Sequence, residues 1–361
     1  MTSTALLLSG GVDSAVALHL LKEQGITPDL YYINIGPDPD QGYSCSKEED
    51  TQICRMLAKR YGANLEIVDL HKEYWENVVG YIITQVKRGL TPNPDVMCNR
   101  LIKFGCFEDL AGSAYEHIAT GHYASRIHYN GQDWLGAAKD PVKDQTDFLA
   151  QITHTQFAKS VFPLGHLMKS EVRTIAQGLH LPPASRRDSQ GICFLGNLQY
   201  KDLVGDFLGK QPGQIVDYTT GKILGTHEGH WFHTIGQRKG LGLSGGPWYC
   251  VQKDIDANIV YVSKGRDESV HHFVHEVQLN GFHTIAGIPW DEEWTTRRIL
   301  YKPRHTPEFG TATLYKNDGQ YKLHFDETPV DGIAPGQFAV IYTDTPSGRI
   351  CVGSGEMALL P

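Results

Sequence analysis

The chain has 361 residues, of which 40% are hydrophobic, 20% charged and 10% aromatic, and 33 Lys+Arg face 41 Asp+Glu for a net charge of −8. This composition is ordinary for a folded globular protein, and no apolar run approaches the ~20 residues of a membrane helix. At roughly 100–200 residues per domain, two or three domains are expected. The negative charge argues against indiscriminate nucleic-acid binding.

Strand-like and helical patterns alternate over the first 200 residues. We expect strands at 5–8, 30–35, 65–68 and 117–120, and helices at 13–23, 47–61, 74–87 and 170–179. This alternation predicts an α/β fold, a parallel sheet with helices on both faces. Short strands with Gly, Pro and Asn turns follow after residue 200 and favour small β-barrels. The expected domains are 1–200, 201–270 and 271–361.

Cysteine usage indicates the compartment. The seven cysteines include no Cys-x-x-Cys pair, which argues against a zinc knuckle or a thioredoxin-like motif. The first residues carry no basic flank and no long apolar region, so they do not indicate a signal peptide. We therefore predict free thiols, a reducing cytoplasmic location and no membrane partner.

A glycine loop, Ser9-Gly10-Gly11-Val12-Asp13-Ser14, lies between the first expected strand and the first expected helix. The glycines let the backbone approach a ligand closely, and N–H groups at a helix N-terminus attract anions. The Walker sequence is absent. The pattern predicts a phosphate-binding loop of another class, and a tight turn without a ligand is the alternative.

Cys98 is the first candidate nucleophile. Two prolines stiffen the preceding loop, and a helix is expected from Asn99, so Cys98 would lie at a helix N-terminus close to Arg100 and Lys103. Such surroundings favour a thiolate, and Asp95 is placed to handle a proton. A buried, inert cysteine in a proline-rich turn is the alternative.

Cys193 is the second candidate. It follows Arg186 and Arg187, whose guanidinium groups could hold phosphates or support a thiolate. Taken alone, this segment is also typical of a connecting loop.

The glycine loop resembles the pyrophosphate-binding loop of the PP-loop ATP pyrophosphatases, which cleave ATP to AMP and pyrophosphate. The Cys98 and Cys193 strings, Thr120-Gly-His-Tyr-Ala124, Lys143-Asp-Gln145 and the glycine-rich segment 234–242 extend the match over nearly the whole chain. Together they resemble one family, the tRNA-specific 2-thiouridylases. The resemblance implies a PP-loop (adenine nucleotide alpha hydrolase-like) domain, a small central domain that contacts tRNA, and a C-terminal β-barrel.

The resemblance also implies site residues. ATP would be bound by Leu7, Leu8, Ser9, Gly10, Gly11, Val12, Asp13 and Ser14, with Ile33 and Gly121 lining the adenosine pocket. tRNA would contact Asn93, Pro94, Asp95, Lys143, Asp144, Gln145, Leu300 and Tyr301. Leu300 departs from the family, where Arg is common. Cys98, Cys193 and Asp95 would be catalytic, and no set of protein metal ligands is expected.

The implied enzyme is a tRNA-uridine 2-sulfurtransferase that uses ATP and Mg²⁺. ATP would adenylate O2 of the wobble uridine, and a persulfide on Cys193 would supply sulfur. Attack by Cys98 on the persulfide would free that sulfur and leave a Cys98–Cys193 disulfide for a reductant to reopen. In a competing route the persulfide attacks the base directly. The sulfur donor would be a cysteine desulfurase or a sulfur-relay protein.

Three other interpretations stay open. Asp95, Cys98 and Cys193 could ligate an iron–sulfur cluster, although the usual Cys-rich spacing is missing. An adenylating PP-loop ligase would act on another substrate, and a non-catalytic tRNA-binding paralogue would keep only the fold. Local excesses of positive charge at 87–103 and 169–187, each +3, predict a salt-sensitive tRNA affinity.

Overall fold

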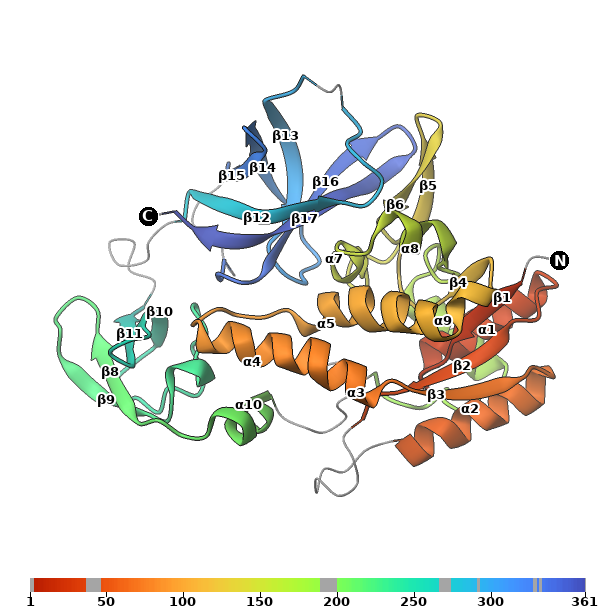
Figure 1. The fold of residues 1–361 in the computed structure, drawn as a ribbon, viewed down its shortest axis with the longest axis horizontal. Helices are drawn as coiled ribbons and strands as arrows, with labels where there is room; N and C mark the ends of the chain where they lie inside the picture. The colour runs from red at the N-terminus through yellow and green to blue at the C-terminus, as the bar shows by residue number, and fades with distance from the viewer. Residues whose placement is uncertain are drawn as a thin grey trace.

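The computed structural model describes residues 3–36, 47–188, 200–265, 274–290, 293–326, 330 and 333–360. Three sheets organise them: an N-terminal parallel sheet, a small middle sheet and a C-terminal barrel (Figure 1). Within these ranges, no helix is both long enough and apolar enough to cross a membrane.

Five parallel strands form the N-terminal sheet. Their spatial order is β3 (Leu65–Asp69), β2 (Asp29–Asn34), β1 (Thr4–Leu7), β4 (His117–Ala119) and β7 (Ser160–Val161). The chain builds outward from β1 in one direction through β2 and β3, and in the other through β4 and β7. The carboxyl ends of β1 and β4 therefore flank the point where the strand order reverses, which is where open α/β sheets bind ligands.

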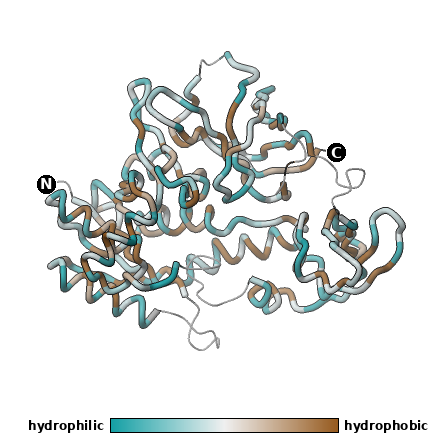
Figure 2. The backbone as a smooth tube through the Cα atoms, turned by 180° about the vertical axis from the view of Figure 1, so that it is seen from behind, coloured by the Kyte–Doolittle hydropathy of each residue, from teal (hydrophilic) through white to brown (hydrophobic). Residues whose placement is uncertain are grey.

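Helices cover both faces of this sheet. Leu6 and Leu8 pack in one apolar cluster with residues of α1 (Val12–Glu23), α2 (Lys47–Tyr61) and α9 (Lys169–Gly178). Ala5 and Leu7 pack in a second cluster with residues of η2 (Trp75–Val79) and α4 (Gly80–Lys87). Figure 2 shows hydrophilic turns on the outside of these covering helices. The predicted doubly covered parallel sheet is confirmed.

Two long helical segments complete the N-terminal part. The first joins α3 (His71–Tyr74), η2 and α4, and the second joins α5 (Pro94–Met97), η3 (Cys98–Cys106) and α6 (Phe107–Leu110). Both η2 and η3 are π-helical, a wider winding that is frequent near functional sites. Shorter helices follow: η4 (Gly112–Ala114), α7 (Thr146–Leu149) and α8 (His154–Lys159).

The middle sheet has four strands. Their order is β10 (Trp248–Asp254), β11 (Ile259–Lys264), β8 (Gly213–Asp217) and β9 (Ile223–His227). Two helices, α10 (Tyr200–Leu208) and η5 (His230–Phe232), connect this sheet to the N-terminal part. Phe207 of α10 stacks on Trp75 with ring centroids 6.1 Å apart.

Six strands close into the predicted C-terminal β-barrel, because β12 pairs with both β15 and β17. They are β12 (Glu276–Thr284), β13 (Thr296–Lys302), β14 (Gly310–Asn317), β15 (Gln320–Phe325), β16 (Phe338–Thr345) and β17 (Gly348–Leu359). The hairpin β5 (Ser125–Tyr129) and β6 (Gln132–Gly136) extends the same sheet, since Gly136 pairs with Ile350. The hairpin was not predicted from the sequence, and it ties the N-terminal part to the barrel.

Candidate active site

The glycine loop joins β1 to α1. Gly10 adopts φ +72°, and a Cβ there would lie 2.9 Å from Cα of Asp50. A side chain is excluded on both grounds, since L-residues rarely adopt this conformation and the neighbouring atom belongs to backbone. Gly10 is therefore required by the close packing of the loop against Asp50, and the predicted close approach to a ligand remains a prediction.

Hydroxyl groups brace the loop from inside. The Ser9 backbone N–H donates to Ser14 Oγ at 3.2 Å, and Ser14 Oγ donates to the Gly11 carbonyl at 3.1 Å. The N-cap of α1 is Gly11, which supplies no side-chain acceptor to the first N–H groups of the helix. Those donors and the positive end of the α1 dipole are suited to hold an anion. The arrangement therefore agrees with the predicted phosphate-binding loop, and its binding of ATP remains a prediction.

Gly121 follows β4 and packs against the same loop. A Cβ at Gly121 would lie 2.8 Å from the backbone nitrogen of Ser14. The structure thus brings Gly121 beside the loop, although 107 residues separate it from Ser14 in the sequence numbering. Ile33 is 3% exposed and packs in the core cluster that also contains Leu7. Their contact with adenosine remains a prediction.

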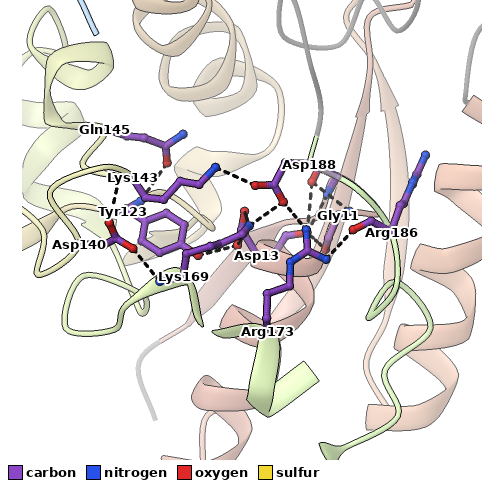
Figure 3. Close-up of polar contacts among 12 residues, drawn as sticks. Gly11, Asp13, Tyr123, Asp140, Lys143, Gln145, Lys169, Arg173, Arg186 and Asp188 are labelled. Carbon is purple, nitrogen blue, oxygen red and sulfur yellow. Dashed lines mark hydrogen bonds and ion pairs between the residues drawn. The ribbon is translucent and has the colours of Figure 1, made fainter. Parts of the chain in front are cut away.

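A network of charged side chains lies beside the loop (Figure 3). Lys169, at the start of α9, donates to both carboxylate oxygens of Asp13 at 2.8 Å and pairs with Asp188 at 2.9 Å. Tyr123 Oη donates to Asp13 at 2.7 Å. Burial is the largest cause that raises the pKa of Tyr123, and the Asp13 carboxylate adds to it, so Tyr123 stays a donor.

Asp188 is the second acidic centre of this network. Its carboxylate accepts hydrogen bonds from Lys143 at 2.7 Å and from Arg173. Burial opposes ionisation of Asp188, but its hydrogen bonds to Lys143 and Lys169 outweigh burial and hold its pKa well below the usual range. The lysines are thereby held near the loop, where they can exchange their carboxylate partners for phosphate oxygens.

Arg186 reaches the loop from the other side. It donates to the Gly10 carbonyl at 3.2 Å and to the carboxylate of Asp50. The structure therefore turns part of the predicted basic stretch at 169–187 inward, onto the glycine loop, which is called the phosphate loop below after its predicted role. Arg186 had been a candidate phosphate ligand. Lys169 is expected from the sequence only as part of the basic stretch, and its pairing with Asp13 and Asp188 is not predicted, because only tertiary packing brings these side chains together.

The helix that carries Cys98 begins earlier than expected. Asn93 is the N-cap, its side chain accepting from the Val96 N–H at 3.3 Å, and Pro94 occupies the first turn. Asn is a preferred N-cap and Pro is favoured at the first helical position, so the helix starts at Pro94 and not at Asn99. The predicted place of Cys98 at a helix N-terminus is wrong, because a full turn precedes it.

Cys98 is 1% exposed and belongs to the core cluster behind the sheet. Its neighbours in sequence are fixed by hydrogen bonds: Asn99 donates to the Phe148 carbonyl at 3.0 Å, and Arg100 donates to Gln151 Oε1 at 2.9 Å. This state keeps the thiol away from the surface. Cys193 lies outside the residues that the structure describes.

His122 lies between the two regions. Its Nδ1 is 2.8 Å from Thr120 Oγ1, and its ring lies 6.4 Å from that of Phe104 in η3. Burial, and to a smaller degree the charge of Lys103, holds the pKa of His122 well below its usual value. His122 is therefore neutral and links the end of β4 to the Cys98 helix.

Three family models cover the chain. The tRNA methyl transferase HUP domain matches residues 2–197, the tRNA methyl transferase PRC-barrel domain matches 201–264, and the aminomethyltransferase beta-barrel domain matches 282–357. The tRNA-specific 2-thiouridylase MnmA 1 of Bacteroides thetaiotaomicron is 56% identical over 354 residues, which span 98% of this chain and 99% of that protein. This chain belongs to the tRNA-specific 2-thiouridylase family.

Other 2-thiouridylases are similar to this chain over nearly their full length. The MnmA proteins of Parabacteroides distasonis and Porphyromonas gingivalis are 54% and 52% identical, and each alignment spans 97% of this chain and 97% and 98% of those proteins. Solved structures align less closely: a 4-thiouridine synthetase–RNA complex with bound ATP reaches a TM-score of 0.34 at 15% identity, over 54% of this chain and 46% of that one. The predicted family is confirmed.

The tRNA contacts expected for a 2-thiouridylase lie in different environments. Asn93, Pro94 and Asp95 are partly exposed at the start of α5, and Lys143 and Gln145 are partly exposed near the phosphate loop. Asp144 is 1% exposed, and Tyr301 is 4% exposed inside the barrel core. Leu300 packs against the core cluster that contains Cys98. Direct tRNA contact by these residues remains a prediction, and for Asp144 and Tyr301 it would require their exposure.

Proposed function

We propose that this chain catalyses the ATP-dependent 2-thiolation of the wobble uridine of tRNA. The observation that carries the proposal is the full-length similarity to proteins named tRNA-specific 2-thiouridylase, at 52–56% identity. The phosphate loop and the Cys98 helix supply the two halves of the chemistry. A cytoplasmic location, where tRNA, ATP and reductants occur together, is part of the proposal.

The first half is activation of the base. The uracil O2 oxygen attacks the α-phosphorus of ATP and expels pyrophosphate, which converts a poor leaving group into AMP. The N–H groups at the start of α1 and the cations Lys169 and Arg186 would bind the phosphates as charge develops. Mg²⁺ bound with ATP would offset phosphate charge and would be held chiefly by phosphate oxygens. Asp13 is the carboxylate on the loop that could join them if Lys169 exchanged it for phosphate.

The second half is sulfur delivery. A cysteine desulfurase or a sulfur-relay protein would load Cys193 as a persulfide. Attack by the Cys98 thiolate on the inner sulfur forms the Cys98–Cys193 disulfide and releases hydrosulfide, which displaces AMP at C2. A dithiol reductant then reopens the disulfide. In the other route the persulfide attacks C2 before Cys98 attacks the disulfide-bonded adduct.

Burial of Cys98 bears on both routes. A thiol that is 1% exposed must be uncovered before it can attack a persulfide. The proposed reaction therefore includes a rearrangement of the Cys98 helix when tRNA binds, and Asp95 on the same helix would accept the thiol proton.

An iron–sulfur cluster is the alternative use of Asp95, Cys98 and Cys193. Among the described residues, no group of three His, Cys, Asp or Glu side chains could hold a metal ion, and Cys193 is outside them. Purification without oxygen decides between the two uses, since a cluster would give bound iron and visible absorbance, whereas the persulfide route needs neither.

The test is release of AMP and pyrophosphate with and without tRNA. We expect turnover that depends on tRNA, and a Cys193→Ala variant that still binds ATP but adds no sulfur. Turnover supported by a small molecule in place of tRNA would indicate a PP-loop ligase. Tight tRNA binding with no turnover would indicate a non-catalytic paralogue.

A further inference from the structure

A buried ion pair joins the C-terminal barrel to the N-terminal part. Lys302, at the end of β13, donates from Nζ to Asp144 Oδ2 at 2.8 Å, and the two side chains are 0% and 1% exposed. The Lys302 ammonium also lies 4.4 Å from the ring centroid of Phe309. Charges are rarely buried this completely, and a buried pair more often specifies one arrangement than adds stability.

The Asp144 carboxylate organises the segment that contains it. It accepts from the Ala138 N–H at 3.0 Å and from Thr146 Oγ1 at 3.0 Å. Thr146 Oγ1 in turn lies 3.0 Å from the hydroxyl of Tyr342 in β16. Asp144 and Thr146 are therefore fixed by two strands of the barrel, through Lys302 and Tyr342.

The alternate residues of this segment face the phosphate loop. Lys143 Nζ donates to Asp188, and Gln145 Oε1 accepts from the Tyr123 N–H at 3.0 Å. Tyr123 donates through its hydroxyl to Asp13 of the loop. Figure 3 shows Lys143 reaching Asp188, Tyr123 reaching Asp13, and Gln145 meeting the backbone of Tyr123. The four side chains of residues 143–146 thus divide between two sides. Asp144 and Thr146 contact Lys302 and Tyr342 of the barrel, whereas Lys143 and Gln145 contact Asp188 and Tyr123 beside the loop.

We propose that Lys302 is a positioning residue for the ATP step: by neutralising buried Asp144 it places Lys143 and Gln145 at the phosphate loop. Loss of the cation would leave an uncompensated buried carboxylate, which would turn toward water or take up a proton. Either change would disturb the hydrogen bonds that Asp144 accepts from Ala138 and Thr146 and so the position of its neighbours. The barrel then controls the affinity for ATP without touching the nucleotide. The inference deepens the proposed function and rests on its assignment of the glycine loop to ATP.

The experiment compares Lys302→Met with Lys302→Arg and with Lys322→Met in the full-length chain. Lys322 is an exposed lysine of β15 in the same barrel. ATP affinity is measured by calorimetric titration, the KM for ATP by tRNA-dependent pyrophosphate release, and tRNA affinity by filter binding. We expect Lys302→Met to weaken ATP binding and raise its KM by about tenfold or more in the absence as well as in the presence of tRNA. Because Lys143 and Gln145 are also candidate tRNA contacts, tRNA affinity is measured separately. Lys302→Arg, which keeps the cation, should recover most of the loss, and Lys322→Met should match the wild type.

A double variant covers the case in which Lys302→Met does not fold. Lys302→Met combined with Asp144→Asn removes both charges, so no buried charge is left alone. We expect the folded double variant still to bind ATP more weakly, because the segment has lost its anchor. A folded Lys302→Met or double variant with wild-type ATP affinity, or one that loses only tRNA binding, would overturn the proposal. ATP titration needs no thiolation, so a wild type that binds ATP without modifying tRNA would refute the proposed function alone.

Discussion

The phosphate loop and the Cys98 helix lie in one α/β unit but are held in different ways. The loop is surrounded by charged partners that come from distant segments, namely Lys169, Asp188 and Arg186. The Cys98 helix is held by burial and by hydrogen bonds to backbone and amide groups, such as Asn99 to the Phe148 carbonyl. The loop can exchange one set of ionic partners for another, whereas Cys98 has to be uncovered.

A substitution in one region should impair its own function and leave the function of the other region unchanged. Cys98→Ala is expected to reduce sulfur transfer by about 10³-fold or more, because no other side chain replaces the attacking thiol. ATP affinity should be unchanged, since the charged network does not include Cys98. Nucleoside mass spectrometry of tRNA and ATP titration measure the two effects. Cys106→Ala, at the end of the same π-helix, is the matched control, and equal thiolation by the two variants would remove Cys98 from the mechanism.

Lys169→Met tests the loop side. It removes the cation that joins Asp13 to Asp188, so we expect pyrophosphate release to fall about 10²–10³-fold. The Cys98 helix should keep its fold, which protection of Cys98 from a thiol reagent measures. Lys139→Met is the control, because Lys139 forms a more exposed pair with Glu171 of the same helix. Equal losses in both variants would mean that general electrostatics, and not the position of Lys169, supports turnover.

Gly10→Ala, compared with Gly25→Ala, separates the effect of the close contact between Gly10 and Asp50 from the effect of a positive φ. Gly10 and Gly25 share a positive φ, but only Gly10 would place a Cβ against the Asp50 backbone, whereas the Cβ position at Gly25 is open. Both alanine variants should lose about 1 kcal/mol of unfolding free energy from the positive φ, and Gly10→Ala should lose more because its Cβ meets the Asp50 backbone. Only Gly10→Ala should also weaken ATP binding, by roughly tenfold. Equal ATP affinities for the two variants would show that the loop tolerates a displaced backbone.

Low pH should destabilise the middle sheet but leave the charged network at the loop intact. Burial lowers the pKa of His230 and His233 to about 4, against 6.5 for ordinary histidine. The unfolded chain therefore binds more protons than the folded one below pH 6.5, and stability falls as the pH drops from about 6.5 toward 4. We expect a loss on the order of 1–2 kcal/mol per histidine at pH 5.

Urea unfolding of the middle sheet at pH 7 and pH 5 measures this loss, and His233→Gln should remove its share. The loop network should persist at pH 5, because the lysines hold the pKa of Asp188 below its usual range and keep it ionised. Weaker ATP binding at pH 5, together with unchanged stability of the middle sheet, would show that acid acts on the loop network and not on the two histidines.

Local patterns predicted what depends on neighbours in sequence. The alternation of strands and helices, the glycine loop and the family followed from spacing and motifs, since periodic burial and turn chemistry are local properties. The start of the Cys98 helix was misplaced because Asn93-Pro94 was interpreted as a stiff loop, although the same two residues form a favoured helix start.

Contacts between distant segments were beyond sequence reasoning. Lys169 meets Asp13 across 156 positions, and Lys302 meets Asp144 across 158. Asp144 was assigned to tRNA with its neighbours Lys143 and Gln145, yet its side chain points into the barrel interface. Lys143 and Gln145 contact Asp188 and Tyr123 instead, and only the packed structure shows which of these neighbouring side chains is buried.

The most direct measurement combines tRNA with ATP, a cysteine desulfurase, cysteine and a dithiol under anaerobic conditions. The tRNA nucleosides are then analysed by mass spectrometry while AMP is quantified. The proposed function predicts exchange of one oxygen for one sulfur in the wobble uridine, with one AMP released per sulfur added. AMP release without any change in tRNA mass, or sulfur addition in the absence of ATP, would contradict it.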